Sequence, residues 1–546
     1  MRESQIKIKK ITGLLILTQP LAKSRQQIPI ILDEISHMIK ETLYVHIQPN
    51  TNKINPVDWT ITKVPCTQEI QNYIREFYSS SASRCMTLDV RILLGHITNA
   101  EISVKTLMHK INKGYDTVLF DNYGQSSPNL SQEILGKIKE IYPIEATDIP
   151  VVQLKNLESV TLNESRSEKD SLIKTYDFVA LGGTFDRLHS GHKVLLNEGC
   201  LLCDKKLTVG VTEKEMNQKK ILRELIEPIE DRKMAVKHFI NDIRPQIEAN
   251  VVGITDVYGP TITDPSLQLI VLSEETVKGG TLINEERKKK SFSQLEEVVI
   301  NLLEDPCHAA SEEVKVSSSS LRRRLLGTVY NTIQVQTEQA PTSPYLIGLT
   351  GGICSGKSTI CKKLQSLGAG IVDCDKLGHA AYQKDTPAFK SIIEAFGDGV
   401  LSETGEIDRR KLGPIVFSDP SQLKKLNGIV WPEIGRLARE QIQQYEKEGK
   451  NIVVLDAAVL LEAEWNKMVH EVWTAVVPQS EAVLRIKERN GLSEEEALKR
   501  VKSQMTNEDR VAKSNVIFCS LWEYEYTQGQ VERAWKLLQE RINTRK

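Results

Sequence analysis

Short, almost wholly apolar runs separated by longer amphipathic segments dominate the last two thirds of the chain. Such runs are typical of parallel strands that helices cover on both faces. The pattern predicts two doubly wound α/β domains, each with its functional site at the carboxyl ends of the strands. The predicted strands are residues 175–183, 206–212, 248–254 and 267–273 in the first of these domains, and residues 345–350, 369–375, 451–461 and 471–478 in the second.

The first part of the chain also alternates strand-like and helix-like segments, but it carries no motif that points to a chemistry. This alternation predicts an α/β or α+β unit. The basic start followed by a short apolar run would suit a targeting segment, but a first strand ending at Pro20 explains it better. The strand-like runs are residues 13–18, 42–48, 88–95 and 116–122, and the helix-like run is residues 70–80.

Two polar stretches divide the chain into three parts. Residues 163–171 lack hydrophobic periodicity, and residues 331–344 are polar and contain two prolines. Both are typical of linkers. We therefore expect an N-terminal region of unassigned role at 1–165, a middle domain at 172–330 and a C-terminal domain at 345–546. The sequence shows no internal repeat.

Composition and charge narrow the class of protein. The chain has 546 residues, of which 71 are basic and 72 are acidic, so no overall positive field favours nucleic acid and anions must bind at local sites. The nine cysteines form no regular framework, which fits a reducing compartment. No stretch reaches the roughly 18 consecutive apolar residues of a membrane-spanning helix.

The first strand of the middle domain ends in an unusual turn. Gly182 and Gly183 are followed by Thr184 and by the stretch from His189 to His192, "HSGH". Glycines at a strand-to-helix turn let backbone N–H groups approach a phosphate. The histidines are one helical turn apart, so both rings can face one anion and, when protonated, offset its charge. A helix start with two surface histidines, or less plausibly part of a zinc site, would give the same pattern.

A serine-rich segment far downstream gives a second signal. Residues 317–320, all serine, directly precede the helical "LRRRLLG" as candidate N-cap residues. Their hydroxyls, the free backbone N–H groups and Arg323 together suit a triphosphate. An ordinary helix cap beside a solvated basic face is the alternative.

The C-terminal domain opens with "GGICSGKST", which fits the phosphate-loop pattern GxxxxGK[ST] between a predicted strand and a helix. In such a loop, backbone N–H groups cradle the phosphates, the lysine neutralises them and the following serine reaches Mg²⁺. We expect Lys357 to be catalytic and Ser358 to be the metal ligand. The predicted ATP-binding residues are Gly351, Gly352, Ile353, Cys354, Ser355, Gly356, Lys357, Ser358 and Thr359.

Carboxylates follow the next predicted strands of this domain. Asp373 and Asp375 lie two residues apart at a strand end, so we expect their side chains on one face, where one of them could deprotonate an acceptor hydroxyl. A turn or helix cap is the alternative. Asp456 ends another strand and is a candidate for the surroundings of Mg²⁺. Residues 482–505 predict two amphipathic helices carrying Arg489, typical of a lid over ATP or of an exposed hairpin.

The two signals of the middle domain together resemble the nucleotidylyltransferase superfamily, which transfers a nucleoside monophosphate and releases pyrophosphate. The resemblance implies catalytic roles for His189 and His192 at the transferring phosphate, and no protein nucleophile. The residues that it assigns to ATP are Gly182, Gly183, Thr184, Ser318, Ser319 and Arg323.

Residues 258–290 resemble the eukaryotic and archaeal phosphopantetheine adenylyltransferases. The chain departs from the bacterial form, so acceptor contacts of that form are not carried over. Lys219 and Lys220 are candidates for a phosphate-contacting lysine, and we expect Lys220 to be catalytic; a solvated face is the alternative. The resemblance implies acceptor-binding roles for Glu274, Thr276, Asn284 and Arg287.

The C-terminal domain resembles the dephospho-coenzyme A kinases in "GLTGGICSGKST", "GAGIVDCDKLGH" and "LDAAVLLEAEW". That resemblance implies that Asp375 is the base for a ribose 3′-hydroxyl and that Arg489 contacts ATP from a lid. The order of the domains is similar to that in the bifunctional coenzyme A synthases of animals, which also have an extra N-terminal region. It implies ATP, 4′-phosphopantetheine and dephospho-coenzyme A as ligands, Mg²⁺ as cofactor, and a cytoplasmic protein with mitochondrial association.

Two other readings stay open at this point. A different fusion of nucleotidylyltransferase and kinase, in NAD or flavin synthesis, would share the phosphate motifs. A regulatory scaffold with ATP sites would instead be expected to carry damaged motifs, whereas His189, His192, Lys357 and Ser358 are intact. The N-terminal region could serve targeting, membrane docking or partner binding, and its composition does not choose among these.

Overall fold

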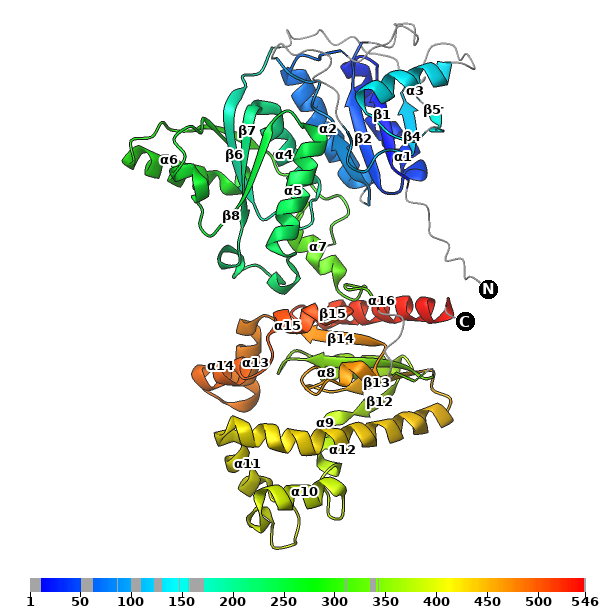
Figure 1. Cartoon of the computed structure of the whole chain (residues 1–546), viewed down its shortest axis with the longest axis vertical. Coiled ribbons are helices and arrows are strands. Elements are labelled where there is room, and N and C mark those ends of the chain that lie inside the picture. The colour runs from blue at the N-terminus through cyan, green and yellow to red at the C-terminus, as the bar shows by residue number, and fades with distance from the viewer. Residues whose placement is uncertain are drawn as a thin grey trace. The chain divides into compact units, whose positions relative to one another are not determined.

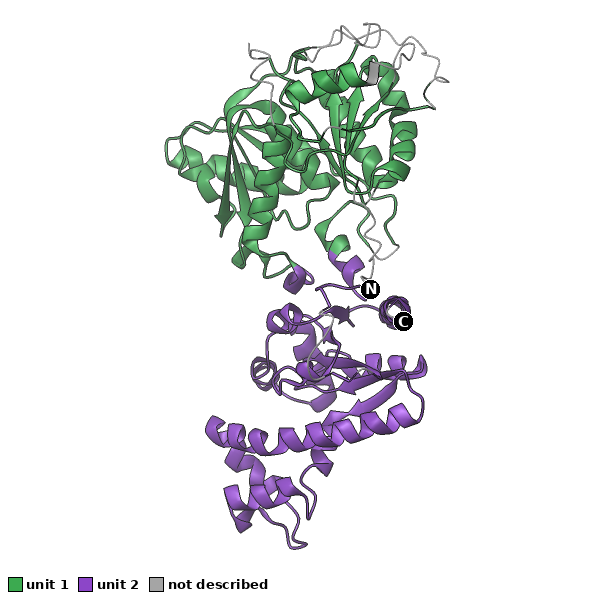
Figure 2. Cartoon of the chain, turned by 45° about the vertical axis from the view of Figure 1, so that its right-hand side comes forward, with its two compact units in different colours: residues 1–220, 226–321 green, residues 221–225, 322–546 purple. Residues whose placement is uncertain are grey.

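The computed structural model of the chain contains three parallel sheets of five strands each (Figure 1). The chain forms two compact units, residues 1–220 with 226–321 and residues 221–225 with 322–546 (Figure 2). Of the predicted linker at 163–171, only Ser171 is among the described residues. The structure describes residues 11–50, 62–85, 87–99, 110–121, 130–146, 148–155, 157, 171–309, 312–333, 340–341 and 343–544.

The N-terminal region is a parallel α/β domain. Its strand order is β3-β2-β1-β4-β5, and every pair of neighbours is parallel. Strands β1, β2 and β4 are buried at every position, as their continuous apolar runs predict. The elements are β1 (Gly13–Leu17), α1 (Leu21–Met38), β2 (Thr42–Ile47), α2 (Gln68–Arg84), β3 (Asp89–Ile92), β4 (Thr117–Phe120), α3 (Leu130–Ile141) and β5 (Val151–Gln153).

The middle domain has a second parallel sheet, in the order β10-β9-β6-β7-β8. The central strand β6 carries the Gly-Gly turn at its carboxyl end. The elements are β6 (Tyr176–Gly183), α4 (Ser190–Leu202), β7 (Cys203–Thr212), α5 (Ile229–Ile243), β8 (Glu248–Ile254), β9 (Leu269–Ser273), α6 (Val277–Lys289), β10 (Glu296–Ile300) and α7 (Ser318–Leu325).

These two sheets repeat one topology, although the sequence shows no repeat. Each begins with its central strand, builds two neighbours on one side through β-α-β crossovers, and then adds two strands on the other side. Thus β1, β2, β3, β4 and β5 correspond in order to β6, β7, β8, β9 and β10. The two domains therefore share a fold without sharing motifs.

The largest hydrophobic core of this unit runs through both of its domains. It includes Leu32 and Phe77 from the N-terminal domain and Val194 and Val209 from the middle domain. Helices α2 and α4 lie side by side (Figure 1) and bring the two domains into contact. The N-terminal domain is thus packed onto the helix that follows the Gly-Gly turn.

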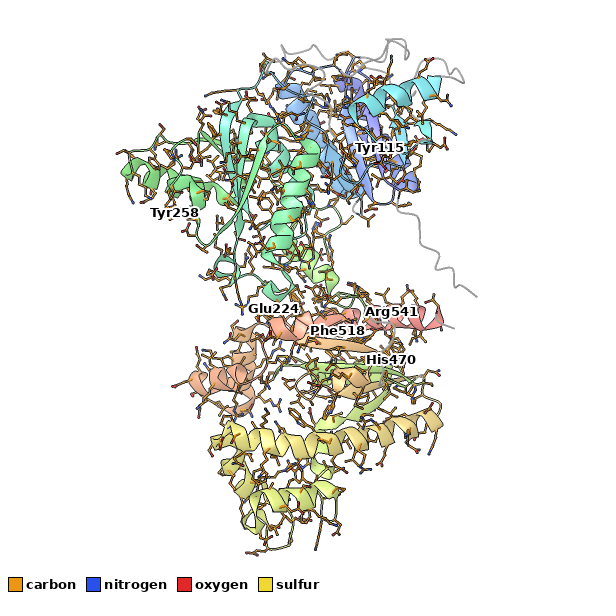
Figure 3. All side chains as sticks on the ribbon, viewed as in Figure 1. Tyr115, Glu224, Tyr258, His470, Phe518 and Arg541 are labelled. Atoms are coloured by element: carbon orange, nitrogen blue, oxygen red, sulfur yellow. The ribbon has the colours of Figure 1, made fainter. Side chains whose placement is uncertain are left out.

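The C-terminal domain has the strand order β12-β13-β11-β14-β15, all parallel, with the phosphate loop after the central strand β11. Phe518 on β15 and Arg541 on α16 are labelled in Figure 3; Phe518 packs against Trp473, and Arg541 pairs with the buried Glu471 at 2.9 Å. The elements are β11 (Tyr345–Gly351), α8 (Lys357–Ser366), β12 (Gly370–Asp373), α9 (Cys374–Ala380), α10 (Pro387–Phe396), α11 (Arg409–Ser418), α12 (Pro420–Lys447), β13 (Ile452–Asp456), β14 (Glu471–Val476), α13 (Gln479–Asn490), α14 (Glu494–Lys502), α15 (Asn507–Ala512), β15 (Val516–Cys519) and α16 (Tyr524–Asn543).

Among the described residues, no helix is both long and apolar enough to cross a membrane.

Candidate active sites

The turn after β6 brings the two predicted catalytic histidines together. His189 is the N-cap of α4, and its Nδ1 accepts a hydrogen bond from the backbone N–H of His192 at 3.4 Å. The two rings stack with centroids 3.7 Å apart, and the His192 ring lies 5.2 Å from that of Phe185. Both imidazoles and the Gly182-Gly183 turn therefore lie at the carboxyl end of the central strand, where a doubly wound domain places its ligand.

The serine-rich segment meets this turn. Ser318 lies with its Oγ 3.4 Å from Nε2 of His189, and the same hydroxyl donates to the backbone oxygen of Asp186 at 3.1 Å. Ser317 caps α7 by accepting from the backbone N–H of Ser320 at 3.1 Å. Ser319 is in the first turn of α7, next to Ser318. Two motifs far apart in the sequence thus face one another.

The histidines are neutral in the absence of an anion. Burial and the charge of Lys193 lower the pKa of His189 to about 3. Burial, followed by His189 and Lys220, lowers the pKa of His192 well below its usual value. We expected protonated rings to offset phosphate charge. In the protein alone both rings are neutral and the His189 ring hydrogen-bonds in that state, and a bound polyanion would favour protonation of the pair. Lys220 is thus near enough to His192 to act on its pKa, and its catalytic role stays a prediction.

Sequence reasoning did not find Arg232, which organises the same strand ends. This side chain of α5 is only 3% exposed. Its guanidinium donates to the backbone oxygen of Thr184 at 2.7 Å and to that of Thr212 at 3.0 Å. It therefore ties the ends of β6 and β7 together behind the turn. An arginine in an amphipathic helix carries no sequence signal for such a role.

Two of the expected acceptor contacts have other tasks in the fold. The guanidinium of Arg287 is fully buried and donates to the backbone oxygens of Ser293 and Asp264 at 2.7 and 2.9 Å. Asn284 donates to the backbone oxygen of Leu295 at 3.1 Å and accepts from its N–H at 2.8 Å. Both side chains hold α6 against neighbouring loops, and their predicted acceptor contacts stay a prediction.

The other two expected acceptor residues follow β9. Glu274 and Thr276 form a short 3₁₀ turn, in which Thr276 closes a capping box with Ser273 at 3.0 Å. Both residues are exposed. Their position at the carboxyl end of a strand of this sheet keeps them compatible with the acceptor role, which stays a prediction.

Arg323 belongs to the second compact unit, and its guanidinium is engaged there. It lies over the ring of Trp522 at 4.3 Å and over that of Tyr526 at 4.9 Å. The Tyr526 hydroxyl also donates to the backbone oxygen of Arg323 at 3.4 Å. A guanidinium that lies over two aromatic rings is stabilised by its attraction to both ring faces. The predicted contact of Arg323 with a triphosphate stays a prediction.

In the C-terminal domain, the phosphate loop follows β11 as predicted. Gly356 has φ of 89°, a left-handed conformation that favours glycine, and it caps α8. A Cβ on Gly351 would lie 2.7 Å from the backbone oxygen of Ala475, so the loop leaves no room for a side chain there. Backbone conformation at Gly356 and close packing at Gly351 therefore require glycine at these two positions of the motif.

Lys357 joins two carboxylates across this site. Its Nζ lies 3.0 Å from Asp375 and 2.6 Å from Asp456. Burial lowers the pKa of Lys357, but Asp456 and Asp375 outweigh it and the net pKa is raised. The lysine is therefore charged and is held between the predicted base and a carboxylate at the end of β13.

The geometry expected for Asp373 and Asp375 was wrong. The strand ends at Asp373, and α9 begins at Cys374, so the two carboxylates do not share a strand face. Asp373 is the N-cap of α9 and accepts from the N–H of Lys376 at 2.9 Å. Asp375, in the first helical turn, is the one that reaches Lys357. Asp373 is therefore a helix cap, and Asp375 is the carboxylate of this pair that contacts the phosphate-loop lysine.

The phosphate loop opens into a cavity of about 700 Å³ that is lined by Lys357, Ser358, Asp375 and Arg489 among others. Two helices, α13 and α14, cover residues 479–490 and 494–502, which confirms the predicted pair. Arg485, another basic residue of this predicted pair, donates to the backbone oxygen of Cys354 at 3.1 Å and ties α13 to the loop.

Family models match each part of the chain. They are described as COASY N-terminal domain over residues 11–129, cytidylyltransferase-like over residues 180–324, and dephospho-CoA kinase over residues 345–520. The predicted order of the domains is therefore confirmed. These matches support the last two steps of coenzyme A synthesis, and none favours a fusion for NAD or flavin synthesis or a regulatory scaffold.

Relatives of the C-terminal domain are numerous. The dephospho-CoA kinase of Carboxydothermus hydrogenoformans is 40% identical over 186 residues, which are 34% of this chain and 90% of that protein. The dephospho-CoA kinase of Geobacter sulfurreducens is 40% identical over 190 residues, 35% of this chain and 96% of that protein. A solved structure, TT1252 from Thermus thermophilus, is 33% identical and covers 36% of this chain and 98% of that one, with a TM-score of 0.32.

One chain therefore joins three features. Its C-terminal domain holds the lysine of a phosphate loop between two carboxylates, its middle domain places a histidine pair against a serine-rich helix, and its N-terminal domain matches a family model of its own. The chain belongs to the dephospho-CoA kinase family through its C-terminal domain, and as a whole it has the domain architecture of a bifunctional coenzyme A synthase.

Proposed function

We propose that the middle domain transfers the adenylyl group of ATP to 4′-phosphopantetheine and that the C-terminal domain then phosphorylates the product, dephospho-coenzyme A, on its ribose 3′-hydroxyl. The observation that carries the proposal is the presence in one chain of both assembled phosphate sites. In one, Ser318 faces His189; in the other, Lys357 lies between Asp375 and Asp456.

In the first reaction, a phosphate oxygen of 4′-phosphopantetheine attacks the α-phosphorus of ATP, and the bond from that phosphorus to the bridging oxygen breaks to release pyrophosphate. The residues that support this step position charge and supply no nucleophile. We assign His189 and His192 to the transferring phosphate, Lys220 to a neighbouring one, and Ser318 and Ser319 to the far end of the triphosphate. Gly182, Gly183 and Thr184 leave the backbone open to the ligand.

In the second reaction, Asp375 takes the proton of the ribose 3′-hydroxyl as its oxygen attacks the γ-phosphorus, and ADP leaves. The contact between Lys357 and Asp375 supports this assignment, because an arriving phosphate would draw the lysine away and free the carboxylate. Asp456 would remain beside Lys357. Arg489 lines the same cavity and would contact ATP from α13.

The donors of the C-terminal cavity suit Mg²⁺ bound together with ATP. Ser358 and Asp375 supply oxygen atoms to the cavity, and oxygen atoms with substrate phosphates are the ligands that Mg²⁺ prefers. Ser358 would hold the ion, which would neutralise the phosphates. A mitochondrial association of the protein rests on the family resemblance alone.

The test is a time course by mass spectrometry with 4′-phosphopantetheine, ATP and Mg²⁺, run on the full chain and two variants. The His192→Ala variant should form neither product but should still convert added dephospho-coenzyme A. The Lys357→Ala variant should accumulate dephospho-coenzyme A, with a loss of phosphorylation of about 10³-fold or more. The controls are His238→Ala on α5 and Lys362→Ala on α8, which change exposed side chains on neighbouring elements.

Formation of coenzyme A by the Lys357→Ala variant at the wild-type rate would remove the C-terminal assignment. Loss of phosphorylation of added dephospho-coenzyme A in His192→Ala would show that the two sites are not separate.

A further inference from the structure

Helix α4, which begins at the catalytic histidines, has a polar face that is buried. Lys193, Asn197 and Glu198 lie on it at 5%, 2% and 3% exposure. Burying charged groups costs free energy unless each has a partner. Partners for all three come from the N-terminal domain, not from the sheet that α4 covers.

The first contact is adjacent to the catalytic turn. Lys193, which directly follows His192, lies with its Nζ 2.8 Å from Oδ1 of Asp89, the first residue of β3. The other oxygen of Asp89 accepts from Arg91 at 2.7 and 2.9 Å. Burial alone would raise the pKa of Asp89, but Lys193 and Arg91 lower it to about 2. Asp89 is therefore ionised and held in place from both sides.

Two further contacts lie one turn along the helix. Asn197 donates to the hydroxyl of Tyr78 at 2.8 Å, and Glu198 pairs with Arg75 at 3.0 Å and accepts from Gln71. All three partners are on α2, which lies beside α4 (Figure 1). Helix α4 is thus held by an ion pair to β3 at its first turn, and by a hydrogen bond and an ion pair to α2 along its second turn.

The N-terminal domain has the fold of its neighbour without the catalytic turn. Only Thr18, Gln19 and Pro20 connect β1 to α1, whereas six residues from Thr184 to His189 connect β6 to α4. The connection in the N-terminal domain contains no glycine or histidine. What this domain does supply is the set of side chains that hold α4.

We propose that the N-terminal domain is a positioning domain for adenylyl transfer. In it, Asp89 acts through Lys193 to hold the rings of His189 and His192 at a fixed position relative to bound ATP. The inference rests on the proposed role of the histidines. Small displacements of a positioned group cost up to about 100-fold in rate, so a pair one residue from His192 can set the rate without touching substrate.

The experiment replaces Asp89 by Asn in the full chain and measures both reactions. We expect kcat for adenylyl transfer to fall about 10- to 100-fold, with KM for ATP nearly unchanged, because the ligand's backbone contacts remain. Phosphorylation of added dephospho-coenzyme A should keep its wild-type rate. The conservative Asp89→Glu variant should recover much of the lost kcat. The matched control is Asp33→Asn, which breaks an exposed pair with Arg84 in the same domain.

A second variant keeps the test decisive if Asp89→Asn does not fold. Tyr78→Phe removes only the hydroxyl that accepts from Asn197 and from the N–H of Ile92, and it should lower kcat for adenylyl transfer several-fold. Unchanged kcat in folded Asp89→Asn would overturn the proposal, as would an equal loss of both reactions. His192→Ala is measured in parallel: if it retains adenylyl transfer, the fault lies in the assignment of the histidines.

Discussion

At the scale of single residues, burial decides the chemistry of the histidine pair. Spacing places two imidazoles on one helical turn, but their charge depends on the neighbours that the fold brings. Lys193 and Lys220 add positive charge beside rings that are already desolvated. The pair is therefore neutral in the protein alone, and a polyanion bound beside it would favour its protonation.

This neutral state predicts a pH dependence of stability. The pKa of His189 is about 3 in the folded chain, below the ordinary value near 6.5, so between these values the unfolded chain binds the additional proton. The contribution of neutral His189 to the free energy of unfolding is fully present above about pH 6.5. It is lost as the pH drops toward 3, by about 1.4 kcal/mol per pH unit for one such group. Thermal unfolding between pH 7.5 and 5.5 should show a smaller decline in His189→Gln than in the wild type. The exposed His238→Gln variant serves as control, and equal declines in all three proteins would contradict the prediction.

At the scale of elements, two segments that neighbour the adenylyltransferase motifs belong to the kinase unit. Residues 221–225 follow the candidate lysines and include Glu224, labelled in Figure 3; residues 322–331 include the end of α7. Leu225 and Leu326 are fully buried in one cluster with Ile517 and Cys519. Backbone hydrogen bonds reinforce this packing, from Gly327 to Ile517 at 2.9 Å and from Tyr330 to Asn515 at 2.7 Å.

Leu326→Ala should therefore weaken the kinase although the residue lies outside the matched kinase domain. Removing a fully buried leucine costs about 2–5 kcal/mol, so kinase activity should be lost at a lower temperature than in the wild type. Heating the full chain and assaying residual phosphorylation measures this. Val329→Ala, at a half-exposed position in the same segment, should have little effect. Equal heat resistance of the Leu326→Ala variant and the wild type would show that the segment is dispensable.

At the scale of the whole molecule, three domains make two compact units. The N-terminal and middle domains share one hydrophobic core, and the C-terminal domain has separate cores. A substitution in the part of this core that the N-terminal domain supplies should therefore lower the heat resistance of adenylyl transfer, although that domain contributes no motif to the reaction.

Heat inactivation of the two activities tests this division. Leu32→Ala, in the N-terminal core, should lower the temperature at which adenylyl transfer is lost and leave phosphorylation unchanged. Leu364→Ala, in a core of the C-terminal unit, should do the reverse. If each variant impaired both activities equally, the chain would unfold as one unit.

Local chemistry in the sequence determined the phosphate loop, the histidine turn, the order of the domains and four of the five strands in each sheet; β5, β10 and β15 were not predicted. Each depends on residues close in the chain: glycines where backbone must approach a phosphate, and apolar runs where a strand is buried on both faces. The tertiary structure alone decided that Asp373 caps a helix, that Arg287 and Asn284 hold loops, that Arg232 ties two strands, and that Asp89 reaches Lys193. The physical reason is that a polar side chain takes its role from the partners that distant segments bring to it, and neither spacing nor composition records those partners.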